Sequence, residues 1–156
     1  MPSASPGPDT VATLWDPMHY SSVRSLASAI RDGRVSSLEF VEACLARIDA
    51  VNPALNAVVQ LRADEARADA GRADEAVARG EPVGPLHGVP MTIKDSFCTK
   101  EVRTTSGAPE LSDHIAENDA VPVARLRGAG AVIFRQDNHP ARIRNRFLAI
   151  ISVSAE

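Results

Sequence analysis

Apolar residues recur at helical spacing in the first third of the chain. One such stretch covers positions 21–32 and stops before Gly33. A second begins at Ser36-Ser-Leu-Glu39, where a serine and a glutamate three residues apart form the pattern of a capping box. Asn52-Pro53 should end this second helix near Val51, because the residue before a proline avoids the helical conformation. The pattern predicts two amphipathic helices.

Farther along, short apolar runs alternate with helical stretches. The expected elements, in chain order, are a strand at 56–61, a helix at 61–79, a strand at 89–94, a helix at 119–128 and a strand at 130–134. The charges of the 61–79 helix indicate a solvated face, and Pro122 fits the first turn of the last helix. The strand runs are continuous rather than alternating, which favours an α/β fold with a mixed, largely parallel sheet.

The two ends of the chain differ from its middle. Residues 1–20 begin with a segment rich in proline and small polar residues, which predicts a flexible leader. Residues 21–140 hold the predicted helices and strands and form one partial domain. Residues 141–156 join a basic cluster to an apolar run, and we expect a divergent tail there.

Composition narrows the class of protein. The chain is 44% hydrophobic and 24% charged, with a net charge of -3, so a nucleic acid is not an expected partner. No basic stretch precedes an apolar run near the start, and no apolar segment is long enough to cross a membrane. These features predict a cytoplasmic protein that does not contact a membrane. Cys44 and Cys98 lie far apart, and no disulfide is expected between them.

Candidate chemistry centres on the segment from Gly84 to Asp95. A loop rich in glycine and proline precedes a short apolar run that ends on Lys94. Desolvation disfavours a charged amine, so a lysine buried by such a strand is a candidate general base. By spacing alone, a Lys-Asp pair at a strand end is more often found on the surface.

Metal and cofactor chemistry have little support. The four histidines are His19, His87, His114 and His139. They are dispersed along the chain and match no zinc-binding spacing, so no metal is expected. His87 is better explained as a hydrogen-bonding residue of its loop. No glycine-rich nucleotide-binding pattern occurs, and no cofactor is expected.

Three segments, taken in their order along the chain, resemble the amidase signature family of hydrolases. They are Gly84-Pro-Leu-His-Gly-Val-Pro-Met-Thr-Ile-Lys-Asp95, Thr104-Thr-Ser-Gly107 and Asp119-Ala-Val-Pro-Val-Ala-Arg-Leu-Arg-Gly-Ala-Gly-Ala-Val-Ile-Phe134. With the N-terminal helices, the resemblance covers about residues 20–140. It implies the N-terminal part of an α/β/α layer fold whose complete sheet is larger than these few strands.

The resemblance also implies a reaction, the hydrolysis of a carboxamide C–N bond. In that family a neutral lysine takes a proton from a bridging serine held by a cis peptide, and that serine deprotonates the nucleophilic serine. Backbone N–H groups of a glycine-rich turn stabilise the oxyanion. By its place in the motif, Lys94 is the catalytic lysine, and the implied substrate is a small-molecule amide.

Both serines of that mechanism are missing from their expected context. The family carries them in a segment of the type Gly-Gly-Ser-Ser-Gly-Gly-Ser, which does not occur here. The serine pairs at Ser21 and Ser36 fit helix caps, and Ser106 lacks an adjacent glycine-rich turn. After Phe134 the match decays and it ends by Arg142, the pattern that a frameshifted, truncated or degenerated gene would leave.

Two classes of function therefore remain open. The chain is either part of a Ser-cisSer-Lys amidase, inactive alone, or a non-catalytic interaction module. In the second case it is completed by a complementary chain, as one half of a split amidase or amidotransferase subunit, or it pairs as a homo-oligomer through its N-terminal helices. Sheet edges and apolar helix faces left uncovered would favour such a partner.

Overall fold

The computed structural model describes residues 22–137, so the predicted leader and tail lie outside the described residues. In chain order the elements are α2 (Val23–Arg31), α3 (Ser37–Leu55), β1 (Val58–Leu61), α4 (Ala63–Ala78), β2 (Pro90–Lys94), the 3-10 helix η1 (Pro109–Leu111), α5 (Val121–Gly128) and β3 (Val132–Asp137). Each helix and strand expected from the sequence is present, with bounds shifted by a few residues.

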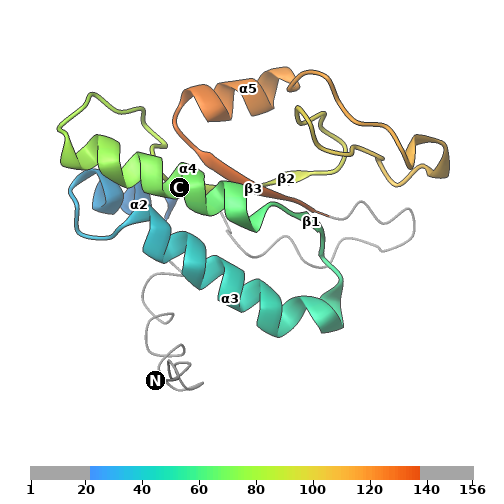
Figure 1. Cartoon of the computed structure of the whole chain (residues 1–156), viewed down its shortest axis with the longest axis horizontal. Helices are drawn as coiled ribbons and strands as arrows, with labels where there is room; N and C mark the ends of the chain where they lie inside the picture. The colour runs from blue at the N-terminus through green and yellow to red at the C-terminus, as the bar shows by residue number, and fades with distance from the viewer. Residues whose placement is uncertain (1–21, 138–156) are drawn as a thin grey trace.

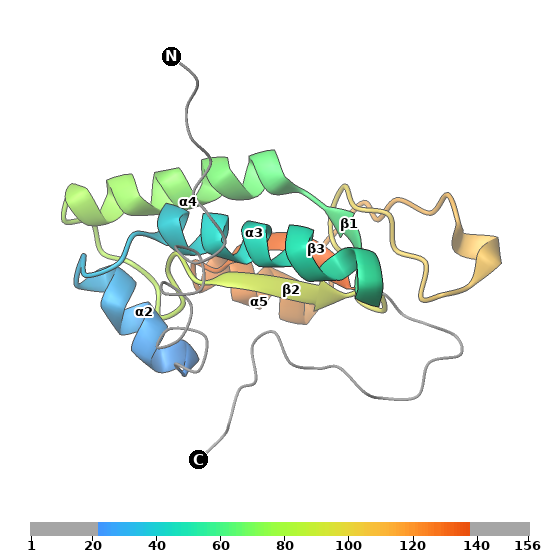
Figure 2. The same cartoon turned by 90° about the horizontal axis from the view of Figure 1, so that it is seen from below.

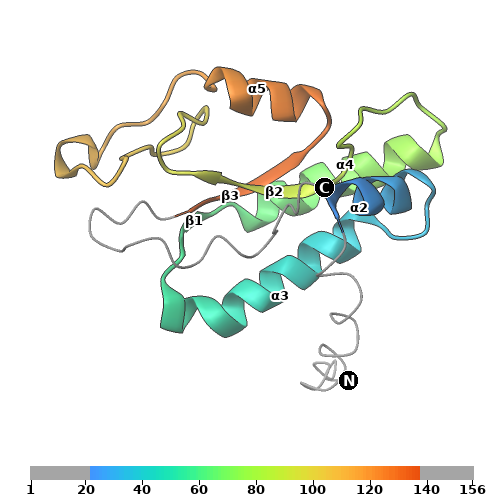
Figure 3. The ribbon, with the colours of Figure 1, turned by 180° about the vertical axis from the view of Figure 1, so that it is seen from behind.

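A three-stranded sheet lies between two layers of helices (Figure 1). Its strand order is β1-β3-β2, with β2 parallel and β1 antiparallel to β3. Helices α3 and α4 cover one face and α5 covers the other, as the view from behind also shows (Figure 3). The predicted α/β fold with a mixed sheet is confirmed.

Alternating side chains of β3 divide the core in two. Val132 and Phe134 belong to the larger cluster, which includes apolar residues of α2, α3 and α4. Ile133, between them, packs instead with Ile93 of β2 and Val123 of α5. Because successive strand residues point to opposite faces, one central strand anchors both helical layers.

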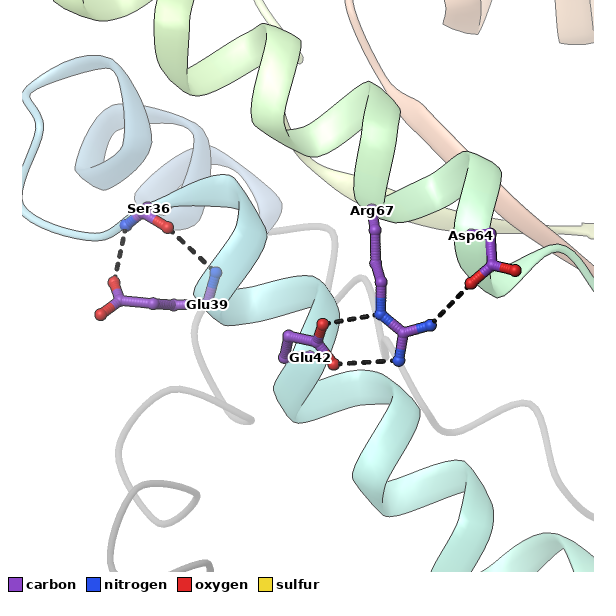
Figure 4. A network of polar contacts seen from close by, with 5 residues as sticks. All are labelled: Ser36, Glu39, Glu42, Asp64 and Arg67. Carbon is purple, nitrogen blue, oxygen red and sulfur yellow. Dashed lines mark hydrogen bonds and ion pairs between the residues drawn. The ribbon is translucent and has the colours of Figure 1, made fainter. Parts of the chain in front are cut away.

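Two predicted helix starts are capped by serines. Ser22 Oγ accepts a hydrogen bond from the Ser25 amide at 3.2 Å. Ser36 Oγ accepts from the Glu39 amide at 3.0 Å, and the Glu39 carboxylate accepts from the Ser36 amide at 3.1 Å (Figure 4). The capping box expected at Ser36 is confirmed, and these serines serve as helix caps.

Helix α4 packs on α3 through small residues and polar contacts. Its buried side chains are alanines, which allow the two helices to approach closely. At the edge of this contact, Arg67 donates to both carboxylate oxygens of Glu42, at 2.7 and 3.2 Å, and also to Asp64 (Figure 4). The hydrogen bonds that Arg67 donates to Glu42 raise the pKa of Arg67 above its usual value. The expected solvated face of α4 therefore also makes specific contacts with α3.

The predicted end of the second helix at Val51 is wrong. Helix α3 continues through Pro53 to Leu55 and ends at Asn56, which has a left-handed φ of 47°. The Asn52 side chain donates to the Val58 carbonyl at 3.1 Å and accepts from the Val58 amide at 2.8 Å. These two contacts hold the last turn against the start of β1, and they offset the local preference against a helical residue before proline.

A long excursion connects β2 to α5 and extends to one side of the sheet (Figure 2). Gln60 of β1 donates to the Arg103 carbonyl at 2.6 Å and so joins this excursion to the sheet. Several large apolar side chains of the excursion, of β1 and of the first turn of α5 are exposed, namely Val59, Leu61, Phe97, Leu111, Ile115 and Val121. No helix among residues 22–137 has the length and apolar character needed to cross a membrane.

Candidate active site

Lys94 is the last residue of β2, at the carboxyl end of the parallel β2–β3 pair. Ile93, the preceding residue, is buried against α5 and fixes the strand. In open α/β sheets ligands bind beyond the carboxyl ends of the strands. The fold thus places the sequence-predicted lysine where such a site is expected.

The loop before β2 is held by backbone contacts with the turn that joins α5 to β3. The Leu86 amide donates to the Ala129 carbonyl and the Gly88 amide to the Gly130 carbonyl, both at 2.9 Å. Both sides of this contact need glycine. A Cβ on Gly84 would lie 2.3 Å from the Ala129 carbonyl oxygen, and a Cβ on Gly130 would lie 2.8 Å from the His87 Cα.

Helices α3 and α4 hold the same loop from the other side. Ser37 Oγ, which is fully buried, donates to the Gly88 carbonyl at 2.6 Å. The His87 ring Nε2 lies 2.9 Å from the Ala73 carbonyl oxygen, so the expected hydrogen-bonding role of His87 is confirmed. The start of β2, and with it the position of Lys94, is therefore fixed by three other elements.

Asp95 follows Lys94 and is buried, with 3% of its surface exposed. Its carboxylate accepts from the Thr105 amide at 2.8 Å and from the Thr105 hydroxyl at 2.5 Å. Its carbonyl accepts from the Ser106 amide at 3.1 Å. The interpretation of Lys-Asp as a surface pair is wrong for Asp95, because the carboxylate fastens a distant loop to the end of β2.

Lys94 itself is exposed in the described part of the chain, which agrees with the surface interpretation of a strand-end lysine and not with a buried amine. The reason is the alternation of strand side chains. Ile93 and Asp95 both point into the protein, so Lys94 between them points outward.

Of the described serines named above, Ser106 is bonded to Asp95, the residue that follows Lys94, and the others have structural roles elsewhere. Ser22 and Ser36 cap helices, and Ser37 is bonded to the loop before β2. Ser106 is exposed, lies in the loop that Asp95 fastens and has a left-handed φ of 50°. None of the described serines lies within a glycine-rich segment of the kind that would supply oxyanion donors.

Among residues 22–137 no group of three histidine, cysteine, aspartate or glutamate side chains lies close enough together to hold a metal ion. Of the four histidines, His19 and His139 lie outside the described residues. Cys44 is a buried thiol and Cys98 an exposed one, and they are not bonded to each other.

Sequence reasoning misses the roles of two acidic residues. It assigns no function to Asp95, although the partner segment Thr104-Thr-Ser-Gly107 stands out as a motif. Asp119 accepts from the Lys100 amide at 2.7 Å and from Arg127 at 2.8 Å, and so attaches the excursion to α5. Burial of a carboxylate depends on residues distant in sequence, and residue spacing gives no signal of it.

Comparison with known proteins gives a consistent family. The model of the family described as Amidase matches residues 39–142. An acylamidase of Rhodococcus erythropolis is 40% identical over 123 residues, which cover 79% of this chain and 26% of that protein. A subunit of the glutamyl-tRNA(Gln) amidotransferase of Alkalilimnicola ehrlichii is 46% identical over 121 residues, with coverage of 78% and 25%.

Solved structures give the same picture. A bacterial aryl acylamidase described as a member of the amidase signature family matches with a TM-score of 0.72 and 30% identity, over 80% of this chain and 26% of that one. The peptide amidase of Stenotrophomonas maltophilia matches with a TM-score of 0.71 and 33% identity, over 78% and 25%. The chain spans about a quarter of the length of these relatives.

Proposed function

This chain belongs to the amidase family, and we propose that it supplies the lysine base of an enzyme that hydrolyses a carboxamide C–N bond. The observation that carries the proposal is the place of Lys94. It ends the Gly-Val-Pro-Met-Thr-Ile-Lys segment within the family match, at the carboxyl end of a parallel strand pair, with an accessible amine. The proposed substrate class is a small-molecule amide.

In this proposal the Lys94 amine is the proton acceptor. It accepts the proton of a bridging serine, which in turn accepts the proton of a nucleophilic serine. The nucleophilic oxygen bonds to the amide carbon, the C–N bond breaks, and the proton leaves with the amine. Water then hydrolyses the acyl ester. Because the glycine- and serine-rich segment does not occur in these 156 residues, further polypeptide must supply both serines.

A graft tests the proposal. The matched quarter of the Rhodococcus erythropolis acylamidase is replaced by the corresponding residues of this chain, and amide hydrolysis is measured. Lys94→Ala should lower kcat by about 10²- to 10⁴-fold, the usual contribution of a general base. Lys100, the other lysine in the chain, gives the matched control, because Lys100→Ala should leave kcat unchanged.

The isolated chain offers an independent measurement. It should show no amide turnover and no labelling by a serine-directed acylating probe. Turnover by the isolated chain, or a graft that keeps full activity without Lys94, would contradict the proposal. Full activity without Lys94 would instead favour the non-catalytic interaction module.

A second candidate function is that of a subunit in an amidotransferase. The 46% identity to the amidotransferase chain of Alkalilimnicola ehrlichii favours it. The two candidates share the cleavage of an amide bond and differ in the fate of the nitrogen. Co-purification of a second polypeptide carrying the missing serines, together with transfer of the released nitrogen to an acceptor, would select the amidotransferase.

A further inference from the structure

We propose that Asp95 and Thr105 are positioning residues that fasten the segment Thr104–Gly107 to the carboxyl end of β2, next to the strand position of Lys94. The inference rests on the proposed role of Lys94 as a base. Neither residue touches the reacting atoms. Their effect is to hold the segment Thr104–Gly107 in a single conformation beside the end of β2.

The contacts between the two segments are dense for so short a stretch of chain. Asp95 accepts four hydrogen bonds over distances of 2.5 to 3.5 Å. Two run from Thr105 to its carboxylate, and two run from the amide and hydroxyl of Ser106 to its carbonyl. Because Asp95 directly follows Lys94, these bonds attach the segment to the residue immediately after the end of β2.

The hydrogen-bond directions explain why a carboxylate occupies this position. An ionised carboxylate only accepts, so the Thr105 hydroxyl must donate its proton to Asp95. The hydroxyl oxygen is then free to accept from the Gly107 amide, which lies at 3.1 Å. A directed chain from Gly107 through Thr105 to Asp95 results. Burial of the carboxylate is tolerated because charge-assisted hydrogen bonds replace its water.

The fastened segment has an unusual backbone. Ser106 and Gly107 have φ values of 50° and 72°, and the left-handed region is unfavourable for a residue with a Cβ, such as serine. Asp95 accepts from the Ser106 amide and the Thr105 hydroxyl accepts from the Gly107 amide, and these bonds hold Ser106 in that conformation. Such local strain persists only where the surroundings determine the conformation, and it is common at functional sites. Asp95 and Thr105 thus fix the backbone of an exposed serine near the end of β2.

Thr105 permits a matched test in the whole chain. Thr105→Val keeps the shape of the side chain but removes the hydroxyl, whereas Thr105→Ser keeps the hydroxyl. The chain is methylated at its lysines with ¹³C-formaldehyde and observed by NMR. Lys94 and Lys100 are the only lysines, so Lys100 is an internal control. Hydrogen exchange of the Ser106 amide is measured in parallel.

In Thr105→Val the Lys94 resonance should shift while that of Lys100 stays. The Ser106 amide should exchange about tenfold faster, because the hydroxyl that donates to Asp95 and accepts from the Gly107 amide is gone. Thr105→Ser should restore both. A change in global stability alone would move both lysines or neither. An unmoved Lys94 resonance, or a Thr105→Ser variant that behaves like Thr105→Val, would overturn the proposal. If Thr105→Val does not fold, Asp95→Asn is examined with the same two measurements. This variant keeps an acceptor for the Thr105 amide but removes the carboxylate that accepts from the Thr105 hydroxyl.

The test separates this inference from the proposed function, because the NMR measurement needs no activity. A shifted Lys94 resonance with a graft indifferent to Lys94→Ala would refute the function and leave the positioning intact. In an active graft, Thr105→Val should lower kcat by about tenfold with little change in KM, since it disturbs geometry rather than substrate contacts. An unchanged kcat there would overturn the positioning role.

Discussion

Replacement of Gly84 by alanine tests how the fold positions β2. The added Cβ would lie 2.3 Å from the Ala129 carbonyl oxygen and 2.7 Å from the Ala129 carbonyl carbon. Both atoms belong to the backbone, so no side-chain rotation relieves the clash. The loop and the α5–β3 turn must separate by about 1 Å to reach ordinary van der Waals contact.

That separation weakens the two backbone hydrogen bonds that join the loop to the turn, both 2.9 Å long. Each such bond contributes about 1 kcal/mol net, and a buried group left unpaired costs about 1 to 3 kcal/mol. We therefore expect Gly84→Ala to lower the free energy of unfolding by about 2 to 4 kcal/mol. Because the loop leads into β2, the variant should also lower kcat in the acylamidase graft.

Urea unfolding followed by far-UV circular dichroism measures the change, with the midpoint compared at constant slope. Gly71→Ala in α4 is the matched control. Nothing lies within 4 Å of a Cβ at that position, and alanine in a helix interior is about 0.5 to 1 kcal/mol more favourable than glycine. A Gly84→Ala variant as stable as the wild type, or a destabilised Gly71→Ala variant, would refute the reasoning.

Three further predictions concern single polar groups. Asp74→Ala should destabilise the chain by about 1 to 2 kcal/mol in urea, because the Asp74 carboxylate accepts from the first two amides of α3 at 2.6 and 3.0 Å; an unchanged midpoint would exclude this role. Asn52→Ala should cost about 1 to 2 kcal/mol and speed amide exchange at Val58, whose backbone loses both side-chain contacts; unaltered exchange would contradict it. The hydrogen bond from Arg34 lowers the pKa of Asp32, so the stability it contributes is complete above the ordinary carboxyl pKa and is lost as the pH falls through the lowered one. Asp32→Asn should remove that part of the acid dependence, and identical pH profiles of the two proteins would argue against it.

Local signals predicted most of the secondary structure. The capping box at Ser36 joins residues three positions apart, and Gly33 has a left-handed conformation just after the first helix. Both features depend on residues close in sequence, so residue type and spacing were enough to predict this helix start and this helix end. Helix α3 shows a feature that local signals did not predict. Its passage through Pro53 depends on bonds between Asn52 and Val58, which belong to the junction with β1. A local preference against helix was offset by a contact that spacing does not reveal.

The sequence named a candidate base but did not reveal the surroundings of that residue. The motif around Lys94 indicated the residue and its chemical lineage, and the family match over residues 39–142 includes it. Its exposure followed from the buried neighbours on either side, Ile93 and Asp95. The partners of Asp95 lie ten and eleven residues away, across a loop whose path no periodicity describes.

The sequence by itself determined which elements form, which family the motifs resemble and which lysine is the candidate base, because these depend on residue type and short-range spacing. Only the tertiary structure decided that Asp95 is buried, that Lys94 faces outward, and that loop 84–90 is held by α3, α4 and the α5–β3 turn. Burial and hydrogen bonding between distant segments arise from packing, because each group is desolvated only when the whole fold has brought its partners together.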